Sequence, residues 1–219
     1  MKIDIVENVL KINDAVAADN RARLRAARIF SLDLIGSPGS GKTALLEATL
    51  RGLNGAQRCG VIVSDLATAR DGERLERWCA QVVQINTGKT CHLEAHHVAS
   101  ALARLDLGQI DILFIENVGN LICPVGFDLG QDVKVGLFSV TEGDDKAAKH
   151  PHFVTASDLL LLNKIDLLPY VSFNRELFGE DIRRLKPAAE LREISAQTGQ
   201  GMDAWMGWLG GKLEQARRG

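Results

Sequence analysis

The residues most able to do chemistry in this chain lie in the segment GSPGSGKT at positions 36–43, which fits G-x-x-x-x-G-K-S/T. Its glycines let backbone N–H groups close around phosphate oxygens, and a following helix adds partial positive charge. The lysine reaches the terminal phosphates and the threonine hydroxyl can bind Mg²⁺. The segment therefore predicts a nucleoside triphosphate site. Its candidate ligands are Gly36, Ser37, Gly39, Ser40, Gly41, Lys42 and Thr43.

The segment NKID at positions 163–166 indicates the base, because it directly follows an apolar run. The Asp166 carboxylate can accept two hydrogen bonds from guanine N1–H and N2–H₂, a donor pair that adenine lacks. NKxD alone also fits a helix-initiating turn, but the phosphate loop upstream and SAQ at 195–197 downstream favour a guanine nucleotide, GTP or GDP. The candidate base ligands are Asn163, Lys164, Asp166, Ser195 and Ala196.

Three carboxylates are candidates for holding Mg²⁺ and the attacking water. Asp65 and Glu116 each end a predicted strand, and Asp71 lies in the polar stretch after the first of these strands. Mg²⁺ usually takes one or two carboxylates together with phosphate oxygens. We therefore expect Asp65 and Glu116, with Lys42, to be catalytic. Asp71 is either a nucleotide-sensitive contact or a helix N-cap.

The elements that position these residues are apolar runs alternating with helical patterns. Strands are expected at 30–35, 59–64, 82–85, 110–115, 134–140, 158–162 and 191–194. Helices are expected at 44–50, 73–80, from 91, at 174–185 and from 201. This alternation predicts an α/β fold of the P-loop NTPase type, with a mostly parallel sheet and helices on both faces. Ligands of such sheets bind beyond the carboxyl ends of the strands, where every motif falls.

The N-terminal residues 4–27 have apolar positions at helical spacing, which predicts a helix or helix pair packed outside the sheet. We therefore interpret 1–28 as an N-terminal helical extension and 29–219 as the GTPase domain.

Composition narrows the classes of partner. The chain has 219 residues and a formal net charge of -2, which argues against non-specific binding to nucleic acid or anionic membranes. There is no apolar run of 18 residues and no signal-peptide pattern, so we expect the cytoplasm. Its four cysteines are too sparse for a disulfide scaffold.

A second group of reactive residues comprises Cys91, His92 and His96, with Cys123 in the loop after Glu116. If a helix begins near residue 91, the two histidines share one face of it. Sulfur and imidazole suit Zn²⁺ or Ni²⁺ rather than Mg²⁺. Spacing alone leaves open a structural interpretation, a buried cysteine with surface histidines. Other residues are expected to be structural: Cys59 and Cys79 in the core, and His150 and His152 in a loop.

The sequence resembles the HypB family, GTPases of the nickel-inserting machinery for nickel–iron hydrogenase maturation, from about Ile29 to Leu209. The combination of the CH pair with ENVGNLICP is specific. The motifs that carry the resemblance are GSPGSGKT at 36–43, INTGKTCHLEAHHV at 85–98, ENVGNLICP at 116–124, SVTEGDDKAAKHP at 139–151, NKIDLLPY at 163–170 and SAQTGQGMDAW at 195–205.

The resemblance implies a metal site at Cys91, His92 and Cys123, with His96 a further ligand in some metal states. Sites of this family form at a GTP-dependent homodimer interface and accept nickel or zinc. The implied partners are a HypA-type nickel metallochaperone and the hydrogenase large-subunit precursor. Many relatives carry an N-terminal cysteine cluster or histidine-rich tract, which residues 1–28 lack.

We expect GTP and Mg²⁺ to order the loops at 65–71 and 116–123, so that nucleotide and nickel affinities depend on each other and slow hydrolysis releases nickel. The segment 167–171, LLPYV, either forms the dimer surface or caps the core.

Three alternative functions are a urease-type nickel GTPase of the UreG kind, a regulatory GTPase with structural Cys and His, and a non-hydrolysing nucleotide-binding scaffold. The residues at 91–92 and 116–120 argue against the first.

Overall fold

The computed structural model describes residues 5–65, 70–88 and 90–218. Within these ranges seven strands form one sheet. They are β1 Phe30–Gly36, β2 Cys59–Asp65, β3 Gln81–Asn86, β4 Ile112–Glu116, β5 Val133–Ser139, β6 Leu159–Asn163 and β7 Leu191–Glu193.

The strand order is β3-β2-β4-β1-β5-β6-β7, and each neighbouring pair is parallel. Parallel neighbours require a crossover connection, which the helices supply. The chain runs from β1 out to β3, returns through β4 and continues on the other side of β1. The carboxyl end of β1 is therefore the switch point at which this architecture binds ligands. The predicted α/β fold with a parallel sheet is confirmed.

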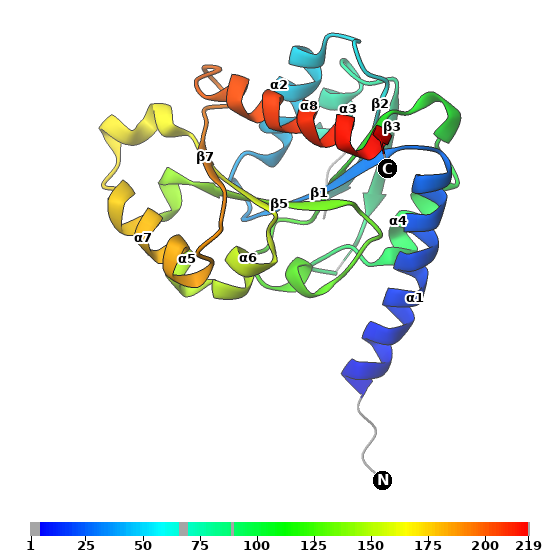
Figure 1. Ribbon diagram of the computed structural model, residues 1–219, viewed down its shortest axis with the longest axis horizontal. Helices are drawn as coiled ribbons and strands as arrows, with labels where there is room; N and C mark the ends of the chain where they lie inside the picture. The colour runs from blue at the N-terminus through cyan, green and yellow to red at the C-terminus, as the bar shows by residue number, and fades with distance from the viewer. Residues whose placement is uncertain (1–4, 66–69, 89, 219) are drawn as a thin grey trace.

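The helices form two layers around the sheet (Figure 1). One layer contains α2, α3 and α8, and the other contains α1, α4, α5, α6 and α7. Their bounds are α1 Ile5–Ala26, α2 Lys42–Leu53, α3 Arg70–Leu75, α4 Ala95–Leu102, α5 Lys146–Lys149, α6 Pro151–Ala156, α7 Arg175–Leu185 and α8 Met202–Arg218. Short 3₁₀ turns are η1 Leu107–Gln109, η2 Cys123–Gly126, η3 Val140–Glu142 and η4 Ile165–Tyr170.

The central strand β1 shows how the two cores arise. All of its residues are buried, and successive side chains face opposite layers. Leu32 and Leu34 belong to the core under α2 and α8, whereas Ile35 packs in the core under α6 and α7. Asp33 alternates with these leucines and is 0% exposed. A carboxylate therefore lies within the sheet's interior.

The expected helix from residue 91 is wrong in its start. Helix α4 begins at Ala95, and the His97 ring nitrogen accepts a 3.0 Å hydrogen bond from the Glu94 N–H just before it. This pairing satisfies one of the backbone donors that a helix leaves open at its start. Cys91 and His92 therefore lie in a loop, and the argument that His92 and His96 share a helical face fails.

Two smaller expectations also need correction. Helix α3 spans Arg70–Leu75 rather than 73–80, and the chain continues as a turn in which the Trp78 N–H donates to the Leu75 carbonyl at 2.9 Å. Asp71 is therefore inside this helix and is not its N-cap. His152 lies in helix α6 rather than in a loop, because Pro151 supplies a favourable first helical residue.

The N-terminal segment forms one continuous helix, α1, which packs on α4 and β1. Asn13 donates to the Asp128 carbonyl at 2.8 Å and accepts from the Ala95 N–H at 2.8 Å. Asn20 donates to the Ala95 carbonyl at 2.8 Å. These buried contacts fasten α1 to the start of α4.

Two further features concern the outer surface. Within the described ranges, no helix is long and apolar enough to cross a membrane.

In the segment 167–171, Leu167, Leu168 and Val171 are partly buried against the core under α7, and Tyr170 is 83% exposed. This packing favours the core-capping interpretation for the three aliphatic residues.

Candidate functional site

The phosphate loop occupies the bend between β1 and α2, as the motif predicts. Gly41 has a φ of 100°, in the left-handed region that favours glycine. A Cβ at this position would lie 2.4 Å from Asn163 Nδ2, so a side chain cannot be accommodated. Lys42 is buried at the start of α2, and its Nζ donates to the carbonyls of Gly36 at 3.2 Å and Ser37 at 3.1 Å. The lysine thus lies across the loop that would receive phosphates.

Asn163 joins the phosphate loop to the predicted base site. Its Nδ2 donates to the Ser40 carbonyl at 3.0 Å, and its Oδ1 accepts from the Ala196 N–H at 3.1 Å. Lys164 Nζ donates to the Gly39 carbonyl at 2.7 Å. The structure therefore brings together three segments that the sequence placed in one site.

Asp166 has the arrangement expected of a ligand for guanine. Its Oδ1 is buried and accepts no hydrogen bond from the described residues. A buried acceptor without a donor is costly, so a ligand carrying N–H groups fits this position. Ser195, 0% exposed, accepts from the Thr198 N–H at 3.0 Å and shapes the neighbouring loop.

Two of the four predicted Mg²⁺ residues, Thr43 and Glu116, meet where α2 approaches the end of β4. Thr43 Oγ1 donates to Glu116 Oε1 at 2.8 Å, and Ser64 Oγ donates to the Glu116 carbonyl at 2.8 Å. A hydroxyl and a carboxylate are oxygen donors of the kind that Mg²⁺ prefers, so these residues fit the ion. Asp65 ends β2, but its side chain and that of Asp71 lie outside the described part of the structure.

A cavity of about 510 Å³ connects these groups. It opens at the carboxyl end of β1, β2 and β4. Its lining residues are Pro38, Gly39, Gly41, Lys42, Thr43, Ala44, Ser64, Arg74, Glu116, Asn117, Val118, Gly119 and Lys164.

A Cys/His cluster forms between the loops that follow β3 and β4. The ligand atoms of Cys91, His92 and Cys123 all lie within 4.8 Å of one another. Cys91 Sγ is 3.6 Å from His92 Nδ1, in the loop before α4, and Cys123 begins the turn η2. Two sulfurs and one imidazole nitrogen are donors suited to zinc or nickel. Folding thus assembles three of the four residues singled out from the sequence.

The fourth residue, His96, lies in the first turn of α4. Its Nδ1 is 3.3 Å from Glu94 Oε2, while the other oxygen of this carboxylate is 3.7 Å from His92 Nε2. Glu94 therefore lies between the two histidines. His96 is not among the three clustered ligands.

Comparison with known proteins identifies the family. The sequence profile described as "CobW/HypB/UreG, nucleotide-binding domain" matches residues 31–193. The hydrogenase maturation factor HypB of Azotobacter vinelandii is 49% identical over 205 residues, covering 94% of this chain and 68% of that protein. This chain belongs to the HypB family.

Solved structures of HypB agree with this assignment. HypB from Archaeoglobus fulgidus has a TM-score of 0.87 and 38% identity, with 93% of this chain and 100% of that chain covered. HypB from Helicobacter pylori, solved in complex with nickel, has a TM-score of 0.88 and 34% identity, with 93% and 95% covered.

The main cause of the raised pKa differs between Cys123 and the two cysteines outside the cluster. Burial raises the pKa of Cys59 to about 12 and also raises the pKa of Cys79. Cys79 lies in the core, as predicted, whereas Cys59 is partly buried and packs against it. The neighbouring Cys91 thiol, followed by burial, raises the pKa of Cys123. Burial lowers the pKa of His92, against the effect of Glu94, and so favours the neutral, ligand-competent imidazole.

Sequence reasoning missed two residues around the Cys/His cluster. Glu94 faces His92, and the Phe127 ring lies 4.0 Å from the His92 ring, centroid to centroid. Glu94 offered a signal as the acidic residue just before a helix, between two histidines. Phe127 offered none, because its contact with His92 spans distant parts of the chain.

Proposed function

We propose that this chain is a GTP hydrolase that couples its nucleotide state to nickel delivery during hydrogenase maturation. One observation carries the proposal: the loop that begins at Glu116, bonded to Thr43 in the phosphate loop, also holds Cys123 of the Cys/His cluster. A change at one end of this short loop must alter the geometry at the other. Affinities for nucleotide and nickel are then reciprocally linked.

Guanine recognition is assigned to Asp166. The carboxylate accepts the paired N–H donors of the base, and Asn163, three residues before Asp166, accepts from the Ala196 N–H. The support is the buried Oδ1 of Asp166, which accepts nothing from the described residues. GTP and GDP are therefore the proposed nucleotides.

Phosphate handling is assigned to Lys42, Thr43, Asp65 and Glu116. Lys42 stabilises charge on the terminal phosphates, and Glu116 with Asp65 orients the attacking water. Bound Mg²⁺, held by Thr43 with carboxylates from Asp65, Glu116 or Asp71, supplies neutralisation of phosphate charge. Turnover is expected on the order of 10⁻⁴–10⁻² s⁻¹, as for switch GTPases without an arginine finger.

The nickel cargo, or zinc in its place, binds at Cys91, His92 and Cys123, with His96 as a candidate further ligand. The proximity of two thiols and one imidazole supports this assignment. The relative from H. pylori was solved with nickel, which agrees with the class of metal.

Transmission between the sites runs through Asn120. Its N–H donates to the Gly36 carbonyl at 3.0 Å, and its Oδ1 accepts from the Ile122 N–H at 2.8 Å. The Cys123 loop is thus bonded directly to the phosphate loop. A γ-phosphate that reorganises Gly36 and its neighbours moves this bridge, and hydrolysis then releases nickel.

The cellular context follows from the family. The proposed partners are a HypA-type metallochaperone as nickel source and a hydrogenase large-subunit precursor as acceptor, in the cytoplasm. A nucleotide-dependent homodimer is proposed as the working state. In it, residues 29–219 form the GTPase domain and 1–28 form a helical extension.

The test measures phosphate release from GTP and ATP, together with nickel stoichiometry, for wild type, Cys91→Ala and Cys123→Ala. Cys79→Ala, a core cysteine outside the cluster, is the control. We expect GTP-selective hydrolysis and nickel binding that the two cluster variants abolish and the control retains. Nickel binding unaffected by the cluster variants would instead support a regulatory GTPase, and guanine nucleotide binding without phosphate release would support a scaffold.

A further inference from the structure

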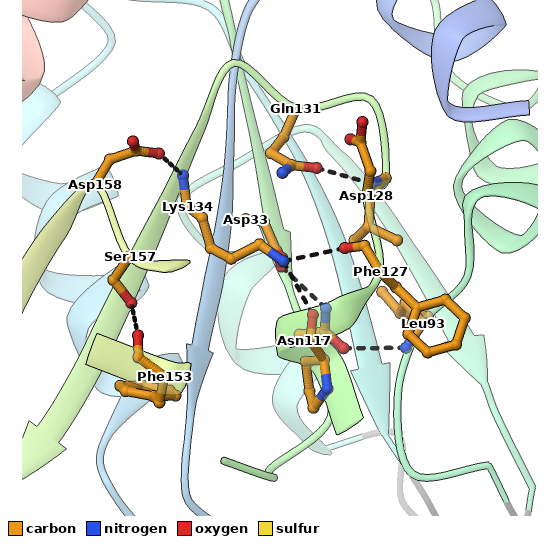
Figure 2. Close-up of polar contacts among 12 residues, drawn as sticks. Asp33, Leu93, Asn117, Phe127, Asp128, Gln131, Lys134, Phe153, Ser157 and Asp158 are labelled. Atoms are coloured by element: carbon orange, nitrogen blue, oxygen red, sulfur yellow. Dashed lines mark hydrogen bonds and ion pairs between the residues drawn. The ribbon is translucent and has the colours of Figure 1, made fainter. Parts of the chain in front are cut away.

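A buried ion pair joins the adjacent strands β1 and β5 (Figure 2). Asp33 of β1 and Lys134 of β5 are register partners, and Asp33 Oδ2 lies 3.5 Å from Lys134 Nζ. Their side chains are 0% and 7% exposed. Neither residue belongs to the nucleotide motifs or to the clustered metal ligands. The pair therefore needs an explanation of its own.

Asp33 connects first to Asn117, which directly follows Glu116. Asn117 Nδ2 donates to Asp33 Oδ1 at 3.0 Å. Asn117 Oδ1 accepts from the Leu93 N–H at 3.0 Å, and Leu93 follows His92 in the chain. These two hydrogen bonds of Asn117 join the end of β4, at Glu116, to the backbone that carries His92.

Lys134 connects to the other side of the cluster. Its Nζ donates to the carbonyls of Pro124 at 2.9 Å and Phe127 at 3.0 Å. Pro124 follows Cys123, and the Phe127 ring packs against the His92 imidazole. The Lys134 ammonium thus holds the backbone next to Cys123 and also holds Phe127, which packs on His92.

Stability alone is a weak reason for such a pair. Moving two charges from water into the interior costs several kcal/mol per ion, and apolar residues of similar volume often replace a buried pair without loss of stability. Burial raises the pKa of Asp33, with Lys134 and Asn117 opposing the shift. What the pair provides beyond apolar packing is a set of directed bonds, and these end on the loops of the cluster.

We propose that Asp33, Lys134 and Asn117 form a positioning network that holds the loops of His92 and Cys123 at the spacing needed to bind the metal. The proposal rests on the proposed nickel-binding function and deepens it. It assigns no direct metal contact to the three residues. It also gives a physical link from Glu116, through its neighbour Asn117, to both halves of the cluster.

Two variants separate positioning from folding. Lys134→Met removes the ammonium but leaves Asp33 uncompensated, so it loses stability. Asp33→Asn/Lys134→Met also removes the carboxylate and keeps an amide oxygen for Asn117, so it recovers part of the lost stability, although the Pro124 and Phe127 carbonyls still lose their donor. We expect each to bind nickel about 10- to 100-fold more weakly than wild type, the range found for groups that orient metal ligands. GDP affinity is expected to change much less than nickel affinity, because neither Asp33 nor Lys134 lines the nucleotide cavity.

The matched control is Ser157→Ala, which removes a different buried hydrogen bond, 2.7 Å from Ser157 Oγ to the Phe153 carbonyl. It should leave nickel affinity unchanged. If the double variant binds nickel with wild-type affinity, whatever its urea midpoint, the network does not position the metal ligands and the proposal fails. If wild type binds no nickel, or binds it unchanged after Cys91→Ala, the proposed function itself fails.

A measurement without metal distinguishes failure of the positioning network from failure of the proposed nickel-binding function. Mild oxidation of the apoprotein with diamide should form a Cys91–Cys123 disulfide readily, because the two sulfurs lie within 4.8 Å of each other. Peptide mapping then gives the rate of disulfide formation. We expect the double variant to form this bond several-fold more slowly than wild type and Ser157→Ala. Equal rates in all three proteins would overturn the positioning role.

Discussion

Thr43 Oγ1 donates a 2.8 Å hydrogen bond to Glu116 Oε1 and so joins the start of helix α2 to the end of strand β4. The chain continues from Glu116 into the loop that carries Cys123. The phosphate-binding element and the Cys/His cluster are therefore linked through one carboxylate and one short loop. Changes to Glu116 should act first on the chemistry of the nucleotide.

Replacing Glu116 by Gln keeps the shape of the side chain and removes its charge. We expect GTP hydrolysis to slow by about 100-fold, because a neutral amide orients water and supports Mg²⁺ poorly. Phosphate release at saturating GTP, over a series of Mg²⁺ concentrations, measures the loss. Glu176→Gln, an exposed change in α7, is the control. A Glu116→Gln protein that hydrolyses at the wild-type rate would remove this carboxylate from the catalytic set.

Replacing Asp166 by Asn should change which base is bound. The amide nitrogen cannot accept the guanine N–H groups, so we expect GDP affinity to fall by at least about 100-fold. Xanthine offers a carbonyl where guanine has its amino group, so xanthosine diphosphate should bind the variant better than GDP. Fluorescent-nucleotide titration measures each constant, with Asp203→Asn as control. Unchanged GDP binding would place the base elsewhere.

Much of the nucleotide site could be predicted because its residues lie in short contiguous motifs. GSPGSGKT and NKID each carry their own turn chemistry, and a parallel sheet brings such segments to one edge. The start of α4 could not be predicted, since Glu94 and His97 form a pairing unlike the usual Ser, Thr, Asp or Asn cap. The pairing of Asp33 with Lys134 depends on the register of distant strands, which local patterns do not encode.

Glu94 provides a test of how His92 is oriented. His92 Nδ1 lies 3.6 Å from the Cys91 sulfur, and Nε2 lies 3.7 Å from the Glu94 carboxylate, so the charge of Glu94 acts on the imidazole without a hydrogen bond between them. We expect Glu94→Gln to weaken nickel binding by about tenfold. His96→Ala should weaken it by less than about threefold in the GDP state, because His96 lies outside the three-residue cluster. Chelator-competition titrations measure both losses of nickel affinity. A larger loss in His96→Ala than in Glu94→Gln would show that His96 is a ligand and that Glu94 does not orient His92.

The pair Arg58–Asp111 predicts a pH dependence of stability. Hydrogen bonds from the Arg58 guanidinium lower the pKa of Asp111 from 3.8 to about 2. A carboxyl with a depressed pKa in the folded state stabilises the fold above its unfolded pKa, and this contribution is lost as pH falls toward about 2. We expect Asp111→Asn to cost about 1 kcal/mol at pH 7, a modest value because the pair faces solvent.

Urea unfolding of wild type and Asp111→Asn between pH 7 and pH 3 checks this. The difference in unfolding free energy should be constant above about pH 5 and should narrow below pH 4. A difference that stays the same down to pH 3 would show that the charge of Asp111 contributes nothing.

The most direct test of the central claim is the nickel dissociation constant measured with GDP and with a non-hydrolysable GTP analogue. The bond between Asn120 and Gly36 and the contact of Thr43 with Glu116 predict that the two states differ. We expect tighter nickel binding with the GTP analogue, by on the order of 5- to 150-fold, and the loss of this difference in Cys123→Ala. Equal nickel affinity in the two nucleotide states would contradict the account.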